Sequence, residues 1–104
     1  MANIKLDFVK FQNNYRVIAK VDGKTLSYTT KDESLAEDVY NFAQKVVSEA
    51  DETGDTPIFD TGKTADDDYM ILATIGDEEF LLNVDTQLDA YLIFNFLTTI
   101  FEED

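Results

Sequence analysis

Apolar and polar residues alternate along two segments of this chain, and each segment precedes one in which apolar residues recur every three to four positions. The first alternation runs from residue 15 to 21, breaks at Asp22-Gly23 and resumes as far as residue 30. A period of two is typical of a half-buried strand, and an Asp-Gly pair favours the tight turn of a β-hairpin. Leu35, Val39 and Val46 then recur at helical spacing. This half of the chain therefore predicts a hairpin followed by a helix.

The second half follows the same order. Alternation from residue 69 to 75 is interrupted by Gly76-Asp77, continues to residue 84, and gives way to a helical pattern from residue 87 to about residue 102. A further strand, residues 4–11, precedes the first hairpin and is expected to turn through Asn13-Asn14. Each predicted helix follows residues that favour an N-cap position; these are Asp32 or Ser34 for the first and Asp85 or Thr86 for the second.

The two halves also match residue by residue when the chain is moved along itself by 54 positions without a gap. Tyr15 then falls on Tyr69, and the match continues through the predicted helix. Further matched pairs are Ala19 with Ala73, Ala36 with Ala90, Asn41 with Asn95 and Phe42 with Phe96. A long ungapped match of this kind is better explained by two copies of one supersecondary unit than by chance.

These patterns predict an α+β fold. We expect an antiparallel sheet of five to six strands with two helices on one face, built from two pseudo-symmetric hairpin–helix units. Residues 1–104 are expected to form a single domain, with unit one at about 1–50 and unit two at about 57–104. Residues 48–68 contain two glycines and the proline and are expected to connect the units. Whether residues 57–60 form a counterpart of the first strand stays open.

Charge separates the two halves. Residues 1–50 carry seven basic and seven acidic side chains, whereas residues 51–104 carry fifteen carboxylates and the single cation Lys63, so the net charge of −14 belongs to the second half. Such a one-signed surface opposes compaction through self-repulsion, and it attracts cationic partners. We therefore expect a basic partner, and direct binding to nucleic acid is disfavoured because its affinity depends mainly on basic side chains.

Several classes of function lose support from the composition. The chain has no cysteine and no histidine, so disulfides, the usual zinc sites, the best nucleophile and the commonest general base are all missing. Asp51, Thr53 and Asp55 surround Gly54 as in a calcium loop, but the ligand order of an EF-hand is not met. We therefore expect no catalytic residue, no metal and no cofactor. No signal peptide or membrane span is expected either, which favours the cytoplasm.

Two acidic runs are the candidate partner-binding residues. They are Asp66, Asp67 and Asp68 in the expected connector, and Asp77, Glu78 and Glu79 at the second hairpin turn. If the connector folds back toward that turn, the two runs form one dense anionic edge, whose carboxylates imitate the phosphates of a duplex. The alternative is a solvated face that serves solubility. Tyr69 is either an aromatic anchor beside these carboxylates or a core residue.

The second half also has more apolar residues than one core stripe requires. Its outer strand face includes Leu72 and Leu81, and apolar residues cover nearly every side of its helix as far as Phe101. A helix that is apolar all round is normally buried. It is therefore either a central core helix or part of an interface, and Leu72, Leu81 and Phe101 are the candidates for self-association, with a homodimer as one outcome.

In size, charge and lack of catalytic residues, the chain is similar to the small acidic anti-restriction and anti-CRISPR proteins of phages and mobile elements. No motif accompanies this resemblance, so it implies no particular residues. It implies an inhibitor in a bacterial host cell that blocks the cationic nucleic-acid-binding surface of a partner protein. The alternative hypotheses are a phage or prophage structural or assembly protein that self-associates through the apolar face of the second unit, and a small-ligand or cation sensor.

Overall fold

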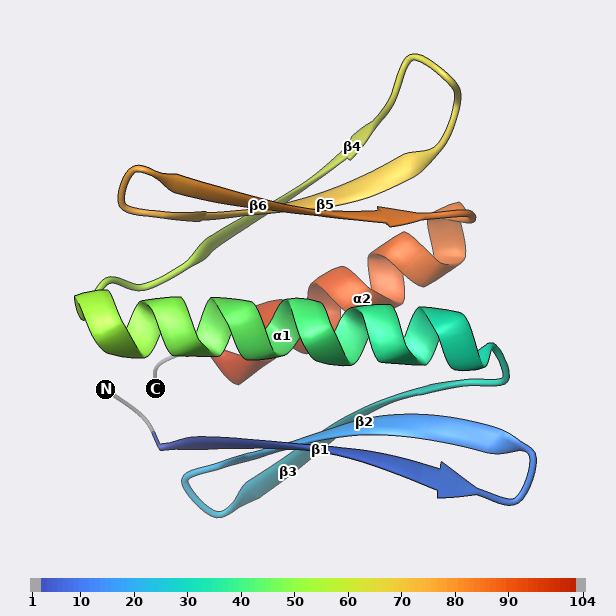
Figure 1. Cartoon of the computed structure of the whole chain (residues 1–104), viewed down its shortest axis with the longest axis horizontal. Coiled ribbons are helices and arrows are strands. Elements are labelled where there is room, and N and C mark those ends of the chain that lie inside the picture. The colour runs from blue at the N-terminus through green and yellow to red at the C-terminus, as the bar shows by residue number, and fades with distance from the viewer. Residues whose placement is uncertain (1–2, 103–104) are drawn as a thin grey trace.

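The computed structural model describes residues 3–102 and contains two three-stranded antiparallel sheets with two helices (Figure 1). The first sheet is followed by one helix and the second sheet by the other. In chain order the elements are β1 (Ile4–Phe11), β2 (Asn14–Val21), β3 (Lys24–Thr30), α1 (Glu33–Thr53), β4 (Ile58–Lys63), β5 (Tyr69–Ile75), β6 (Glu78–Val84) and α2 (Gln87–Ile100). The predicted α+β class with its antiparallel strands is confirmed.

Tight turns join the strands of the first sheet. Asp22 and Gly23 both have positive φ, 48° and 87°, which is the backbone that a two-residue hairpin turn with an Asp-Gly sequence adopts. The hairpin predicted at this pair is confirmed, with Val21 opposite Lys24. The turn between β1 and β2 lies one residue earlier than predicted. Gln12, with φ of 57°, takes the left-handed position, and Asn14 already belongs to β2.

The helix caps follow the sequence prediction. The Asp32 carboxylate accepts a hydrogen bond from the Leu35 backbone N–H at 3.2 Å, and the Thr86 hydroxyl accepts one from the Asp89 N–H at 3.1 Å. Each satisfies a backbone donor that the first helical turn leaves free. Helix α1 is longer than expected, because it continues to Thr53 and ends at Gly54 with φ of 78°. Residues 48–53, expected in the connector, therefore form its last turns, with Glu49, Asp51 and Glu52 among them.

The rest of the expected connector contains strand β4. Ile58–Lys63 pair with β5 along their whole length, with Phe59 opposite Ala73 and Lys63 opposite Tyr69. Residues 58–60 therefore belong to a strand that precedes the second hairpin as β1 precedes the first; it extends to Lys63, and Pro57 lies just before it. Asp60 and Gly62 weaken the strand signal of this segment in the sequence.

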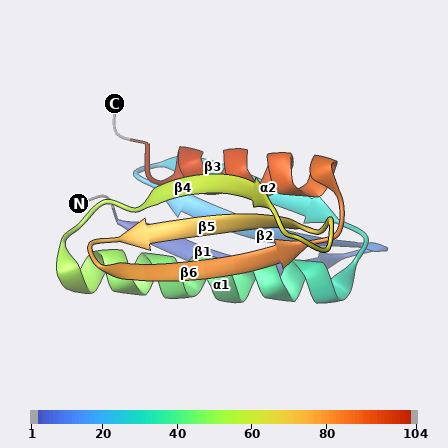
Figure 2. The same cartoon turned by 90° about the horizontal axis from the view of Figure 1, so that it is seen from above.

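The helices lie between the two sheets. Figure 1 shows sheet β1–β3 below and sheet β4–β6 above, with α1 and α2 in the middle, and Figure 2 shows the two helices side by side under β4–β6. Helix α1 contacts β1 and β2 and reaches β6, whereas α2 contacts β4 and β5 and reaches β3. The expected single sheet with two helices on one face is therefore wrong. Strand alternation identifies the buried face of each strand, but it does not tell which strands share a sheet.

The core lies where the inner sheet faces meet this helical layer. Val17, Ala19, Ile71 and Ala73 point inward from the two central strands and are fully buried. The helices contribute buried residues to the same cluster; these are Val39, Phe42, Ala43, Val46 and Ala50 from α1 and Ala90, Ile93, Phe96, Leu97 and Ile100 from α2. Helix α2 packs between two sheets, which accounts for the buried apolar residues on two of its sides.

Candidate functional site

Asp66, Asp67 and Asp68 occupy the loop between β4 and β5. Thr64 closes this loop: its hydroxyl accepts a hydrogen bond from the Asp68 N–H at 3.1 Å, and its own N–H donates to the Asp68 carbonyl at 2.7 Å. Asp67 takes the left-handed backbone conformation with φ of 67°, which an aspartate tolerates better than most residues. The loop thus holds three consecutive carboxylates in exposed positions.

Asp77, Glu78 and Glu79 lie at the opposite end of the same sheet. They form the turn from β5 into β6, while Asp66–Asp68 precede the start of β5. Because a strand rises about 3.4 Å per residue, the seven-residue β5 holds the two runs about 20 Å apart. The condition for one dense anionic edge is therefore not met. The connector does not fold back to the turn, because β4 pairs with β5 along its full length and carries the loop away from the turn.

Each run gains a further carboxylate from a neighbouring segment. At the turn, the Asp55 carboxylate oxygen lies 3.1 Å from the place that a Cβ on Gly76 would occupy. At the other end, Tyr69 pairs with Val84, which brings Asp85 next to the start of β5. We call Asp55 with Asp77–Glu79 the turn-end acidic group, and Asp66–Asp68 with Asp85 the loop-end acidic group. Sheet β4–β6 therefore has carboxylates at both of its ends.

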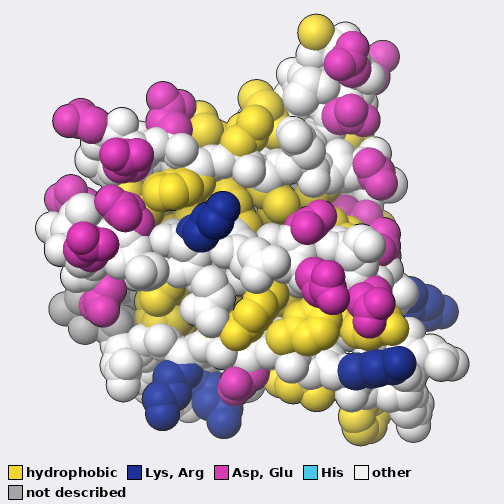
Figure 3. Space-filling model, viewed as in Figure 1, with side chains coloured by type: hydrophobic (Ala, Val, Ile, Leu, Met, Phe, Trp, Pro, Cys, Tyr) yellow, Lys and Arg dark blue, Asp and Glu magenta, His cyan; other side chains and the backbone are white. Residues whose placement is uncertain are grey.

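Cations gather on the other sheet. Lys5, Arg16 and Lys20 lie on the exposed face of β1 and β2, and Lys5 pairs directly opposite Lys20. Figure 3 shows acidic side chains at both ends of the upper part of the molecule, while several basic side chains lie along its lower edge. The charge asymmetry between the halves of the sequence is therefore also an asymmetry between two opposite faces in space, with the helices between them.

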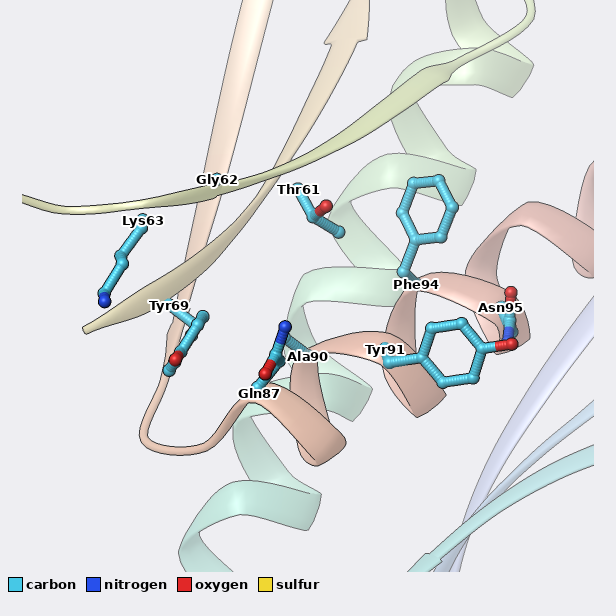
Figure 4. A pocket seen from close by; sticks show the side chains of 9 residues that line it. All are labelled: Thr61, Gly62, Lys63, Tyr69, Gln87, Ala90, Tyr91, Phe94 and Asn95. Carbon is cyan, nitrogen blue, oxygen red and sulfur yellow. The ribbon is translucent and has the colours of Figure 1, made fainter. Parts of the chain in front are cut away.

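A cleft of about 680 Å³ opens between β4 and α2, next to the loop-end acidic group. The strands contribute Thr61, Lys63 and Tyr69, and α2 contributes Gln87 and Phe94. Figure 4 shows Thr61 and Phe94 on facing sides of this space, with Tyr69 and Gln87 at the end nearest Lys63. The remaining lining residues are Gly62, Ala90, Tyr91 and Asn95. The walls are thus aromatic rings with amide and hydroxyl groups among them.

The same place in the first half of the chain is filled. Phe8 on β1 stacks against Tyr15 with ring centroids 6.2 Å apart and meets the edge of Tyr40 on α1 at 5.9 Å. Phe8 pairs with Val17 across the sheet, as Thr61 pairs with Ile71. Lys10 lies over Tyr15 at 5.7 Å, and Lys63 lies over Tyr69 at the same distance. Where the first half has a phenyl ring, the second half therefore has a small hydroxyl side chain and a cleft.

Tyr69 packs as the core alternative expected, and its role as an aromatic anchor for a partner stays a prediction. It is half-buried and packs against the core cluster, and it also lines the cleft. Above it, the Lys63 ammonium lies 3.3 Å from the Asp67 carboxylate. This ion pair is exposed, with the Asp67 side chain 85% accessible, so it contributes little to stability. Its consequence is positional, because it places the single cation of the second half at the junction of the cleft and the acidic loop.

A buried tyrosine connects the first sheet to α2. The Tyr28 hydroxyl donates a hydrogen bond to the Asp89 carboxylate at 3.2 Å, and the other oxygen of Asp89 accepts one from the Thr86 hydroxyl at 2.8 Å. Burial raises the pKa of Tyr28 far above its ordinary value, and the negative charge of Asp89 raises this pKa further. This arrangement holds the N-terminus of α2 against β3.

The three candidates for self-association do not form one surface. Leu72 and Leu81 face each other across β5 and β6 on the outer side of the sheet, and Leu81 is 53% exposed. Phe101 instead follows α2 and packs against Phe59, with ring centroids 5.7 Å apart. A second apolar patch lies on the exposed side of α2, the helix expected to be either core or interface; it consists of Leu88, Tyr91 and Leu92, which were not among the three candidates. The three residues are at positions i, i+3 and i+4, so they lie on one side of the helix, and this spacing was the signal that could have distinguished them from the core residues.

The described part of the chain offers little to other chemistries. Within residues 3–102 no group of three or more acidic side chains is arranged to hold a metal ion, and no helix there is long and apolar enough to cross a membrane. Glu102, at the end of this part, is exposed, whereas Glu103 and Asp104 of the C-terminal acidic run lie outside it. Comparison with protein-family models, curated proteins and solved structures finds no match to this chain.

Proposed function

We propose that this chain is a non-catalytic binding protein that blocks a cationic, nucleic-acid-binding surface of a partner protein, in the manner of a DNA mimic. The observation that carries the proposal is that all six candidate carboxylates, Asp66–Asp68 and Asp77–Glu79, are exposed at the two ends of one sheet. Lys63 is the only basic residue in the second half of the sequence, so intramolecular pairing leaves most of this charge to solvent.

The separation of the acidic groups specifies the partner further. Two groups about 20 Å apart on one rigid sheet favour a surface with two basic patches at a similar distance. Charge of this kind accelerates encounter and selects among partners by complementarity. In this proposal the chain acts as an inhibitor in a bacterial cytoplasm, like anti-restriction or anti-CRISPR proteins. It occupies the groove of a nucleic-acid enzyme and excludes its substrate.

We further infer that the two halves are copies of one unit and that the second copy acquired the function. The order of three strands and a helix in each half supports this inference, as does the strand register, with Ala19 opposite Leu26 and Ala73 opposite Phe80. In this view the inner residues keep the packing of the unit, while the exposed residues of the second copy diverged toward acidic and apolar side chains.

The experiment compares three amide variants with the native chain. One replaces Asp66–Asp68 by asparagine, one replaces Asp77–Glu79 by the matching amides, and one combines all six changes. Each immobilised chain is incubated at low salt with nuclease-treated bacterial lysate and eluted with rising salt. The captured protein is then purified and tested for duplex DNA binding with and without the native chain. Circular dichroism confirms that each variant is folded.

We expect the native chain to capture a nucleic-acid-binding protein, to release it at moderate salt and to displace DNA from it. Each three-residue variant should release the partner at lower salt, and the six-residue variant should fail to capture it, because exposed charge pairing is screened by ions. Undiminished capture by a folded six-residue variant would falsify the proposal. If the captured protein still binds DNA in the presence of the native chain, the chain binds a partner but does not act as a DNA mimic.

Self-association through the apolar outer face of β4–β6 is the second candidate function, as expected of a structural or assembly protein. It is favoured by the exposure of Ile58 and Leu81, 64% and 53%, on either side of Leu72. Analytical ultracentrifugation distinguishes the two functions. An association that persists at high salt and is lost on Leu81→Asp supports this candidate, whereas a monomer at all concentrations contradicts it.

A further inference from the structure

The cleft between β4 and α2 has walls that suit an aromatic ring, and its volume of about 680 Å³ leaves ample room for one. In the first half, the Phe8 ring fills the equivalent space between Tyr15 and Tyr40, at centroid distances of 6.2 and 5.9 Å. In the second half, Thr61 is on the helix-facing side of β4 and is nevertheless exposed, because nothing covers it. A ring between Tyr69 and Phe94 would make the same contacts that Phe8 makes.

The chemistry of the cleft suits a neutral ring with polar surroundings. Tyr69 and Phe94 provide faces and edges for aromatic packing, while the amides of Gln87 and Asn95 provide hydrogen-bonding groups nearby. The only charged side chain in the lining is Lys63, and its ammonium already lies 3.3 Å from the Asp67 carboxylate. The interior of the cleft therefore favours an uncharged aromatic group over an anion.

The surroundings of the cleft indicate a ligand that extends beyond the ring. The loop-end acidic group, Asp66–Asp68 with Asp85, lies beside it at the end of the sheet. On the other side, Tyr91 lines the cleft and continues into the exposed apolar residues Leu88 and Leu92 of α2. A ligand that reaches both has a cationic part and an apolar part next to its ring, which is a combination that a polypeptide provides.

We propose that the β4–α2 cleft receives an aromatic side chain of the partner protein, and that lysine or arginine residues flanking this side chain pair with Asp66–Asp68. The inference rests on the proposed function and deepens it, because it assigns an anchor within the cationic surface of that partner. Charge complementarity brings the partner to the acidic face, and the ring in the cleft fixes its position.

The test uses three acetylated and amidated pentapeptides and the isotope-labelled full-length chain. The probes are Gly-Lys-Phe-Lys-Gly, its alanine analogue Gly-Lys-Ala-Lys-Gly, and the acidic analogue Gly-Glu-Phe-Glu-Gly. Amide chemical shifts are followed by NMR during each titration. We expect the Lys-Phe-Lys peptide to bind about tenfold more tightly than the alanine analogue, since aromatic packing adds to charge pairing. Its shifts should centre on residues 61–69 and 87–95, and the acidic analogue should bind weakest.

Variants at Thr61 distinguish the contribution of the cleft to peptide affinity from that of the acidic loop. Thr61→Phe fills the cleft as Phe8 fills its own space, so it should reduce the affinity for Lys-Phe-Lys to that for the alanine analogue and leave the latter unchanged. Thr61→Ile, whose β-branched side chain suits a strand, should give a partial loss and serves if the phenylalanine variant misfolds. Thr29→Phe, on the exposed face of β3, is the matched control and should have no effect.

Each contrary result has a distinct meaning. Equal affinity for Lys-Phe-Lys and the alanine analogue overturns the aromatic anchor while the anionic recognition still stands. No binding of either lysine peptide to any acidic residue contradicts the proposed function itself. Shifts at the cleft that follow the concentration of the chain alone identify a second copy as the occupant. Benzyl alcohol binding as tightly as the Lys-Phe-Lys peptide identifies a small aromatic ligand, and either finding overturns the partner side chain.

Discussion

The first and second halves of this molecule have the same order of three strands and a helix, but they differ in the side chains that they expose. Around Phe8 the first half is closed, with three aromatic rings in contact, and its surface charges are balanced. Around Thr61 the second half is open, and its surface is acidic and partly apolar. Both inner faces nevertheless bury a central strand of the same character, with Val17 and Ala19 in one and Ile71 and Ala73 in the other. The comparison teaches that the two halves are alike where side chains are packed and differ where side chains are exposed.

The largest effect is expected when the first half is made like the second. Phe8→Thr removes a half-buried ring from between Tyr15 and Tyr40, so it should lower the free energy of unfolding by about 2 kcal/mol, less than the cost for a fully buried phenylalanine. Urea denaturation measures this change. Thr61→Ala is the control at the open position and should change the stability by less than about 0.5 kcal/mol. Equal losses for both variants would contradict the difference between a filled and an open space.

A second effect concerns Tyr28. The residue 54 positions later in the chain is Leu82, which has no hydroxyl group. Tyr28→Phe removes the hydrogen bond to Asp89 and should cost about 1 kcal/mol at neutral pH. Because the folded state raises the pKa of Tyr28, the unfolded chain loses this proton first as the pH rises. The native chain should therefore lose stability progressively above the ordinary tyrosine pKa of about 10.

Thermal unfolding between pH 7 and pH 11 tests this prediction. The stability of the phenylalanine variant should fall less steeply above pH 10 than that of the native chain. Tyr91→Phe, at a site where the side chain is 61% exposed, is the matched control and should leave the alkaline loss unchanged. Identical slopes for the native chain and Tyr28→Phe would contradict the assignment.

The smallest effect concerns the hairpin turns. Asp77→Asn removes one charge from the turn-end acidic group and should raise stability by about 0.3 kcal/mol at low salt, with the gain disappearing in concentrated salt. Asp22→Asn, in the corresponding turn of the first half, is the control and should show no such salt dependence, because the charges of that half are balanced. A gain for Asp77→Asn that is equal at all salt concentrations would point to turn geometry instead of repulsion.

The sequence predicted the elements better than their arrangement. Periodicity located seven of the eight elements, and the Asp22-Gly23 turn and the caps at Asp32 and Thr86 were identifiable from local chemistry. The separation into two sheets was not predictable in this way. It depends on whether the edge strands of the two halves pair with each other, and periodicity does not indicate such pairing. The apolar pattern of α2 was a partial signal, because a helix between two sheets buries two sides, whereas Leu88, Tyr91 and Leu92 are apolar and exposed.

The cleft escaped prediction for a definite reason. An ungapped shift of 54 residues aligns β5 with β2, but the strand register shows that β4 corresponds to β1 at a shift of 53. The ungapped match aligns Phe8 with Gly62 instead of Thr61. The sequence therefore did not indicate that Thr61 stands where the first half has a phenyl ring. The acidic residues were identified as candidates, but their distance from each other depended on β4, which the sequence signal left uncertain.

The division into two small sheets has a consequence for how the chain avoids its own copies. Within residues 3–102, β1, β3, β4 and β6 each have one side that no strand of the chain covers. Such open sides offer backbone donors and acceptors to strands of other molecules and promote aggregation. Asp60, Glu78 and Glu79 lie on β4 and β6, where their charge repels another acidic copy. These carboxylates therefore oppose edge-to-edge pairing between copies, and amide variants should be more prone to form fibrils at high concentration.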